Sequence, residues 1–198
     1  MLRVVALLLC LASLVYGRRS PNADLIEQYY KTGPESGRYS NNVVEDALLD
    51  VPGLISKYGY PVEVHNVVTE DGYILEMQRI PHGRDTHNTP YILAEAGYDV
   101  WLGNARGTYY SRNHVSLNPD SSREFWQFSW EEIGARDLTA MIDYTLQVSG
   151  KSRLHYIGHS QGTTVFWTMA SLRPEYNDKI ISMQALAPVA YMRYNENP

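Results

Sequence analysis

Strand-like and helix-like segments alternate along the second half of the chain, and this alternation restricts the possible folds more than any other feature. The expected order is strand, helix, strand, helix, strand, with the segments Tyr98–Leu102, Trp130–Val148, Arg153–Gly158, Gln161–Leu172 and Ile180–Leu186. The first helix has apolar residues at helical spacing, and Gly150 just past its end is a common helix terminator. Strands that alternate with helices predict the α/β class, a parallel sheet covered by helices.

A β-hairpin is expected ahead of this unit. Residues alternate in character from Val62 to about Thr69, Asp71-Gly72 is a strong turn signal, and Tyr73–Ile80 predicts the returning strand. Residues 81–90 predict a loop, and residues 91–96 predict a short helix. Residues 18–50 predict a polar lead-in, which leaves residues 51–198 as the expected domain.

The N-terminus has the pattern of a secretory signal peptide. Arg3 precedes an apolar run from Val4 to Val15, and Gly17 is a small residue at the expected cleavage point. The run is too short for a transmembrane helix, which needs about 17–25 residues. We therefore expect removal of residues 1–17 and a soluble, exported product. The alternative is a cytosolic protein with a hydrophobic first helix.

Charge and cysteine content exclude several classes of function. The formal net charge is −5, so the basic surface of a nucleic-acid-binding protein is not expected. The only cysteine, Cys10, lies in the expected leader, which excludes a disulfide or a cysteine-based zinc site from the processed chain. His155 and His159 straddle a strand and a turn and do not share a helix face, so no metal pair is expected. No cofactor is expected either.

One motif predicts nucleophilic chemistry. Gly158-His159-Ser160-Gln161-Gly162 matches the pattern Gly-x-Ser-x-Gly between a predicted strand and a predicted helix, the arrangement of a nucleophile elbow. Such a sharp turn strains the serine backbone and requires small neighbours. Ser160 is the expected nucleophile, and the backbone N–H of Gln161 at the helix start is the expected oxyanion donor. The alternative is a tight turn with an idle serine.

The elbow and three further stretches resemble the acid lipases, the family of gastric, lysosomal and insect digestive lipases. The stretches are Gly158–Thr164, Gly59–His65 with Thr69–Leu75, Gly97–Gly107, and Asp137–Tyr144, within a resemblance that runs from about Asp50 to Met192. The resemblance implies an α/β-hydrolase fold and hydrolysis of neutral lipid esters, acylglycerols or sterol esters, by Ser160. It also implies transient contact with a lipid interface and a location in a digestive lumen or the lysosome.

The chain departs from this family first by a missing strand–helix unit. The resemblance places that unit between Pro90 and Tyr91, where it would end in a His-Gly turn that completes the oxyanion hole. His82-Gly83 offers the same residue pair, but it follows the second strand of the hairpin, so we interpret it as part of a loop. The sequence therefore predicts the N-terminal portion of an α/β hydrolase with one internal unit missing.

The second departure concerns the catalytic base. In this fold the acid and the histidine follow the serine in the chain. All six histidines, His65, His82, His87, His114, His155 and His159, precede Ser160. None of the later acids, Glu175, Asp178 and Glu196, is suitably placed, so the triad acid and histidine are absent from this chain.

Three hypotheses remain. The first is an exported lipase represented by an incomplete chain, which is inactive as it stands because a serine hydroxyl needs an adjacent base. The second is a non-catalytic lipid-binding pseudoenzyme. The third, a peptidase or thioesterase on the same fold, is disfavoured by the extent of the lipase resemblance. Arg106 and Arg112, flanked by Tyr109 and Tyr110, suggest an anion site, but a loop braced against the sheet is the preferred interpretation.

Overall fold

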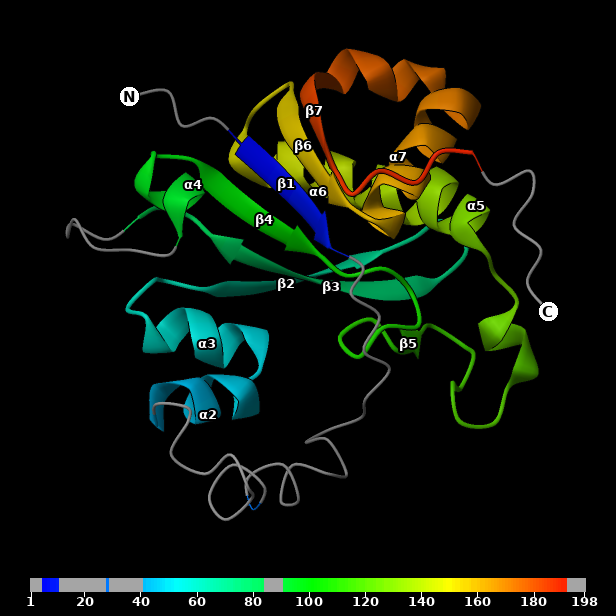
Figure 1. The fold of residues 1–198 in the computed structure, drawn as a ribbon. Helices are drawn as coiled ribbons and strands as arrows, with labels where there is room; N and C mark the ends of the chain where they lie inside the picture. Colours follow the sequence, from blue (N-terminus) through cyan, green and yellow to red (C-terminus); the bar gives the residue numbers. More distant parts are fainter. Residues whose placement is uncertain (1–4, 11–27, 29–40, 84–90, 192–198) are drawn as a thin grey trace.

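The computed structural model of the protein describes residues 5–10, 28, 41–83 and 91–191 (Figure 1). Its main feature is one sheet with strand order β2-β3-β4-β1-β6-β7, with β5 paired to β3 outside this path. The strands are β1 (Val5–Cys10), β2 (Glu63–Val68), β3 (Tyr73–Ile80), β4 (Asp99–Gly103), β5 (Asn113–His114), β6 (Leu154–His159) and β7 (Ile180–Leu186). The strands β4, β1, β6 and β7 are parallel to one another, which confirms the predicted α/β class.

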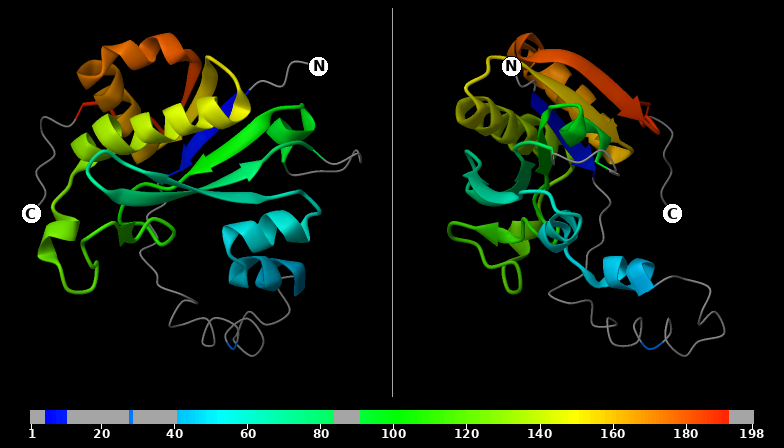
Figure 2. Two further views of the ribbon diagram at one scale, coloured as in Figure 1. Left: turned by 180° about the vertical axis from the view of Figure 1, so that it is seen from behind. Right: turned by 90° about the vertical axis from the view of Figure 1, so that its left-hand side faces the viewer.

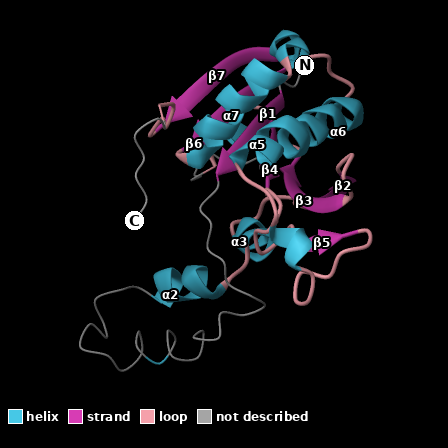
Figure 3. Ribbon diagram, turned by 90° about the vertical axis from the view of Figure 1, so that its right-hand side faces the viewer, coloured by secondary structure: helices cyan, strands magenta, loops and turns pink. Residues whose placement is uncertain are grey.

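Helices lie on both faces of the sheet. They are α2 (Asn41–Leu48), α3 (Val51–Lys57), α4 (Ile92–Glu95), α5 (Trp130–Glu132), α6 (Thr139–Ser149) and α7 (Gln161–Leu172). Seen from behind, α6 and α7 lie in front of β1 and β6 (Figure 2). The same two helices cover this face in Figure 3, where α6 contacts β1, β2 and β4, and α7 contacts β1 and β6.

Two apolar cores lie on opposite faces of the sheet. The larger core, beneath α6 and α7, contains Trp101 and Tyr156 with no exposed surface. The smaller core includes Ile55 of α3 and Val100 of β4. Because successive strand residues point to opposite faces, Val100 and Trp101 contribute to different cores. The sheet is therefore buried on both sides at β4, whereas β7 is largely exposed and β6 is only half-buried on its second face.

The predicted hairpin is confirmed. Strands β2 and β3 pair antiparallel, with Val68 opposite Ile74 next to the turn. Gly72 has φ +94°, a conformation that side chains rarely adopt, and a Cβ there would lie 2.7 Å from the Val115 side chain. Glycine is thus required at position 72 both for the positive φ of the turn and for the close packing of the Val115 side chain.

The structure differs from the prediction in the lead-in and in the long helix. Helix α2 lies within the expected polar lead-in, and its Asp46 accepts hydrogen bonds from Lys57 Nζ (2.7 Å) and Tyr58 Oη (2.5 Å). The helix predicted over residues 130–148 is interrupted by a π-helical turn, Ile133–Leu138. A Cβ at Gly134 in that turn would lie 2.7 Å from the Val165 carbonyl, so α7 approaches the turn closely. The predicted loop segment 84–90 lies outside the described residues.

The N-terminal segment occupies the interior of the sheet. Strand β1 pairs with β4 on one side and β6 on the other, both in parallel. Its residues belong to the apolar run of the expected signal peptide. The strand–helix unit expected to be missing at Pro90–Tyr91 leaves no gap in the sheet, because β1 lies between β4 and β6 and makes the sheet continuous.

Candidate active site

The predicted elbow forms at the carboxyl end of β6. The strand ends at His159, α7 begins at Gln161, and Ser160 between them has φ +52° and ψ −118°. A positive φ in a residue other than glycine is a strained conformation that occurs frequently at functional sites. A Cβ at Gly158 would lie 2.7 Å from the Gly162 carbonyl oxygen, so the strand–helix crossing leaves no room for a side chain at Gly158. The predicted need for small neighbours is met.

The backbone around Ser160 is held from two directions. Its N–H donates to the Leu186 carbonyl of β7 (2.9 Å), and its carbonyl accepts from the Thr163 N–H (2.9 Å). Gln161 occupies the first position of α7, where a backbone N–H has no acceptor within its own helix. The Gln161 N–H thus lies next to Ser160 at the start of α7 with no acceptor within that helix.

Two threonines that sequence analysis did not single out complete the elbow. The buried Thr163 hydroxyl donates to the Ser160 carbonyl (2.6 Å) and accepts from the Val189 N–H (2.9 Å). The Thr164 hydroxyl donates to the Val189 carbonyl (2.9 Å). Both backbone groups of Val189 are therefore bound by α7. The chain after β7, which includes Ala187 at φ +47°, is fixed beside Ser160.

No described residue acts as a base for Ser160. Among residues 41–83 and 91–191, no histidine or carboxylate forms a hydrogen bond with the Ser160 hydroxyl. Two of the histidines have other neighbours: His155 Nδ1 lies 2.7 Å from Ser182 Oγ, and His65 Nδ1 lies 3.0 Å from Tyr144 Oη. His159 is an exposed residue.

The pair His82-Gly83 lies far from the elbow. It follows Ile80, which is paired with Val100 at the amino end of β4, whereas Ser160 lies at the carboxyl end of the parallel strands. A Cβ at Gly83 would lie 2.7 Å from the Ala94 carbonyl, so this glycine packs against α4. The interpretation of this pair as part of a loop, and not as an oxyanion turn, is confirmed.

An ion-pair cluster braces the loop after β4. Arg106 donates to Asp137 (2.8 Å) and to both carboxylate oxygens of Asp71 (2.7 and 2.9 Å), and its guanidinium lies 3.9 Å from the centre of the Tyr73 ring. Burial raises the pKa of Asp137 to about 6, and Arg106 keeps this carboxyl ionised at neutral pH. Burial also acts to raise the pKa of Asp71, but hydrogen bonds from Arg106, Thr69 and Arg136 outweigh it and hold that pKa well below its usual value. The preferred interpretation of Arg106 as a brace is confirmed.

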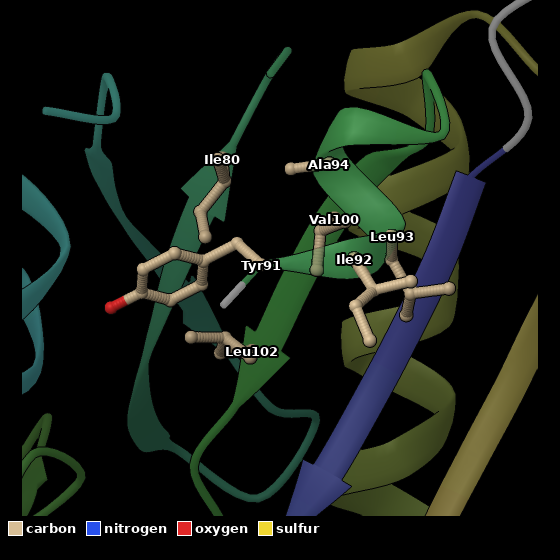
Figure 4. Close-up of a pocket in the computed structure, with 7 residues that line it drawn as sticks. All are labelled: Ile80, Tyr91, Ile92, Leu93, Ala94, Val100 and Leu102. Carbon is tan, nitrogen blue, oxygen red and sulfur yellow. The ribbon is translucent and has the colours of Figure 1, made fainter. Parts of the chain in front are cut away.

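An apolar pocket of about 270 Å³ lies on the face of β4 opposite Trp101 (Figure 4). It is lined by Ile80, Tyr91, Ile92, Leu93, Ala94, Val100 and Leu102. Helix α4 and strand β4 form most of its wall, and β1 lies between β4 and β6, the strand that ends at the elbow. This pocket is therefore separate from the site that Ser160 would serve.

The fold and the elbow can now be compared with family models built from known protein sequences. Residues 81–196 match the family model described as the alpha/beta hydrolase fold, and residues 51–100 match the partial alpha/beta-hydrolase lipase region. The chain belongs to the α/β-hydrolase family, and residues 51–100 match a lipase region described within that family.

The curated relatives bear the names of lipases. The chain is 51% identical to Lipase 1 of Drosophila melanogaster, 39% identical to Lipase member K of Mus musculus and 42% identical to the gastric triacylglycerol lipase of Mus musculus. The matches cover 83%, 84% and 77% of this chain, but only 42%, 49% and 46% of the relatives. The chain thus spans less than half of the length of each relative.

The comparison also bears on the missing unit. The match to the Drosophila lipase extends over 185 positions but covers 83% of this chain, which is fewer residues than 185. The relative therefore has residues inside the matched stretch that this chain lacks, in agreement with the predicted loss of an internal segment. Within the described residues, no helix is long and apolar enough to cross a membrane.

Proposed function

We propose that Ser160 is the nucleophile of a carboxylic ester hydrolase that acts on neutral lipids, acylglycerols or sterol esters. The strained elbow is the observation that supports this most directly, because Ser160 is held at φ +52° where a strand meets a helix N-terminus. Named relatives add support, among them a triacylglycerol lipase at 42% identity.

The elbow supplies two of the parts that ester hydrolysis requires. The Ser160 hydroxyl oxygen attacks the ester carbonyl, and the Gln161 N–H donates to the oxyanion that forms. A base must accept the hydroxyl proton and return it to the leaving alcohol. In this fold the acid and the base follow the nucleophile, and the relatives extend well beyond the matched stretch. We propose that residues of that further portion supply both groups.

The stretch 1–198 by itself then has no ester turnover. Loss of the base from a serine triad reduces kcat by about 10⁶-fold. A non-catalytic lipid-binding role is the second candidate. It is favoured by one observation, that no histidine among the described residues contacts the Ser160 hydroxyl. The first proposal also includes a leader over residues 1–17 that directs the protein to secretion or to the lysosome. It includes transient contact with a lipid interface as well.

A chimera tests the nucleophile. Residues 154–189, which contain β6, α7 and β7, replace the corresponding stretch of the mouse gastric triacylglycerol lipase, so that the base and acid come from the host. We expect hydrolysis of tributyrin by the chimera and none by its Ser160→Ala variant. The matched control is Ser171→Ala in the same chimera, an exposed serine near the end of α7, which should keep its activity. Equal activity of Ser160→Ala and its parent would overturn the assignment.

The chain 1–198 itself tests whether the stretch lacks a base for Ser160. The expected result is no release of nitrophenol from a short-chain ester above buffer. A burst of product that disappears in Ser160→Ala would contradict this expectation. Retention of the chain on triolein emulsion droplets without turnover would favour the pseudoenzyme.

A further inference from the structure

The N-terminal strand is an interior strand of the parallel part of the sheet, with β4 on one side and β6 on the other. Its residues pair in register with both neighbours: Leu7 is opposite Trp101 of β4 and opposite Tyr156 of β6. All three of these side chains have no exposed surface. Figure 1 shows β1 between β4 and β6 with no other strand alongside. Without β1, no backbone hydrogen bonds would join β4 to β6, and the sheet would be divided into two parts.

This position has strict requirements. Both neighbours present backbone N–H and C=O groups that need partners, because buried backbone groups are nearly always paired. The face of the slot beneath α6 and α7 is apolar and fully buried at Trp101 and Tyr156, so its occupant must present an apolar side chain there, as Leu7 does. On the other face β6 contributes the half-buried His155 and Ile157. Val5–Cys10, with the sequence VALLLC, contains no polar or charged side chain that would oppose burial.

The same residues form the apolar run expected of a signal peptide. A signal peptide and an interior parallel strand both need a short uncharged run, so one sequence satisfies both. In the uncleaved chain β1 is covalently joined to the other strands, whereas cleavage after Gly17 would leave only non-covalent contacts to hold it in the sheet. The fate of residues 1–17 therefore decides how the sheet is completed.

We propose that the space between β4 and β6 is an acceptor site for one apolar extended segment in parallel orientation, and that Val5–Cys10 is its occupant. The segment binds in the uncleaved chain and also as a separate peptide after cleavage. This is strand addition, in which main-chain hydrogen bonds hold the segment and apolar side chains select it. The proposal does not rest on ester hydrolysis.

A cross-link tests the uncleaved chain. Cys10 is the only cysteine, and its register partner in β6 is His159. In the full chain with His159→Cys, a short thiol-specific linker should join residues 10 and 159 within one molecule. The control is Val64→Cys, on exposed β2, which β3 and β4 separate from β1. Equal linking in both variants, or linking only between molecules, would overturn the proposal.

A cleavage experiment tests binding of the separate peptide. A protease site placed after Gly17 in the full chain allows the leader to be released after folding. We expect the 1–17 peptide to co-elute with the remainder, and to exchange with excess labelled peptide of the same sequence. A labelled peptide with Leu7→Asp should bind at least tenfold more weakly, and one with Leu7→Ile should bind as the parent does. Loss of the peptide on cleavage, with or without aggregation of the remainder, would overturn the proposal.

Discussion

Gly158 shows at the scale of one residue why the elbow restricts its sequence. A methyl group there would lie 2.7 Å from the Gly162 carbonyl oxygen, which belongs to backbone and cannot rotate away. We expect Gly158→Ala to lower the free energy of unfolding by about 1–3 kcal/mol, the usual cost of overpacking. Gly150→Ala is the control, because φ is +66° there but the surrounding space is open. It should cost about 1 kcal/mol from backbone strain alone. Urea titration of both variants measures the difference, and equal losses would contradict the role of the clash.

The Thr163 hydroxyl connects Ser160 to Val189, which lies 26 residues after Thr163 in the chain. In Thr163→Val the half-buried Val189 N–H loses its acceptor, so we expect a loss of about 1 kcal/mol in the free energy of unfolding, the net contribution of an ordinary hydrogen bond. Thr163→Ser keeps the hydroxyl and should recover most of this loss. Thermal melts of the three proteins provide the measurement. If the serine variant is no more stable than the valine variant, the hydrogen bonds do not explain the effect.

Residues of the elbow differ in how far the sequence reveals them. Gly158, Ser160, Gln161 and Gly162 are found from local spacing, since their roles depend on one turn of backbone. Thr163 depends on Val189, and that contact exists only once β7 has paired with β6. No local pattern encodes it.

Elements were predicted well where their ends carry a local signal. The bounds Gln161–Leu172 and Ile180–Leu186 agree with the structure, because the elbow begins the helix and Pro174 ends it. The π-helical turn was not predicted, since it arises where Gly134 meets α7. The N-terminal strand was not predicted either, because a run such as VALLLC fits a leader, a helix and a buried strand alike.

The brace between β4 and the π-helical turn is an element-scale contact with a measurable strength. Asp137 is fully buried and binds Arg106, which is itself 3% exposed. Asp137→Asn removes one charge from this buried pair. We expect a loss of about 3 kcal/mol in the free energy of unfolding, the lower end of the range for removing one partner of a buried ion pair. The exposed pair Arg112–Asp120 is the control. Asp120→Asn should change stability by less than about 1 kcal/mol. Similar small losses in both variants, measured by urea titration, would show that burial does not strengthen the Asp137 contact.

At the scale of the whole molecule, the missing internal unit and the N-terminal strand compete for one position in the sheet, between β4 and β6. The relative with 51% identity has residues inside the matched stretch that this chain lacks, and this chain fills the space between β4 and β6 with Val5–Cys10. Both segments cannot pair with β4 and β6 at once. Restoring the internal strand should therefore displace the N-terminal one.

Insertion of the corresponding strand–helix unit of the Drosophila lipase between Pro90 and Tyr91 tests this competition. We expect the link between residues 10 and 159 in the His159→Cys background to fall at least tenfold, because the inserted strand is connected through short loops and competes at high effective concentration. An insertion of equal length made of glycine and serine is the control, and it should leave the link intact because it offers no apolar strand. Mass spectrometry of the linked peptides measures both. Unchanged linking after the strand–helix insertion would mean that the restored unit pairs elsewhere, and that the N-terminal strand holds its position by more than the lack of a competitor.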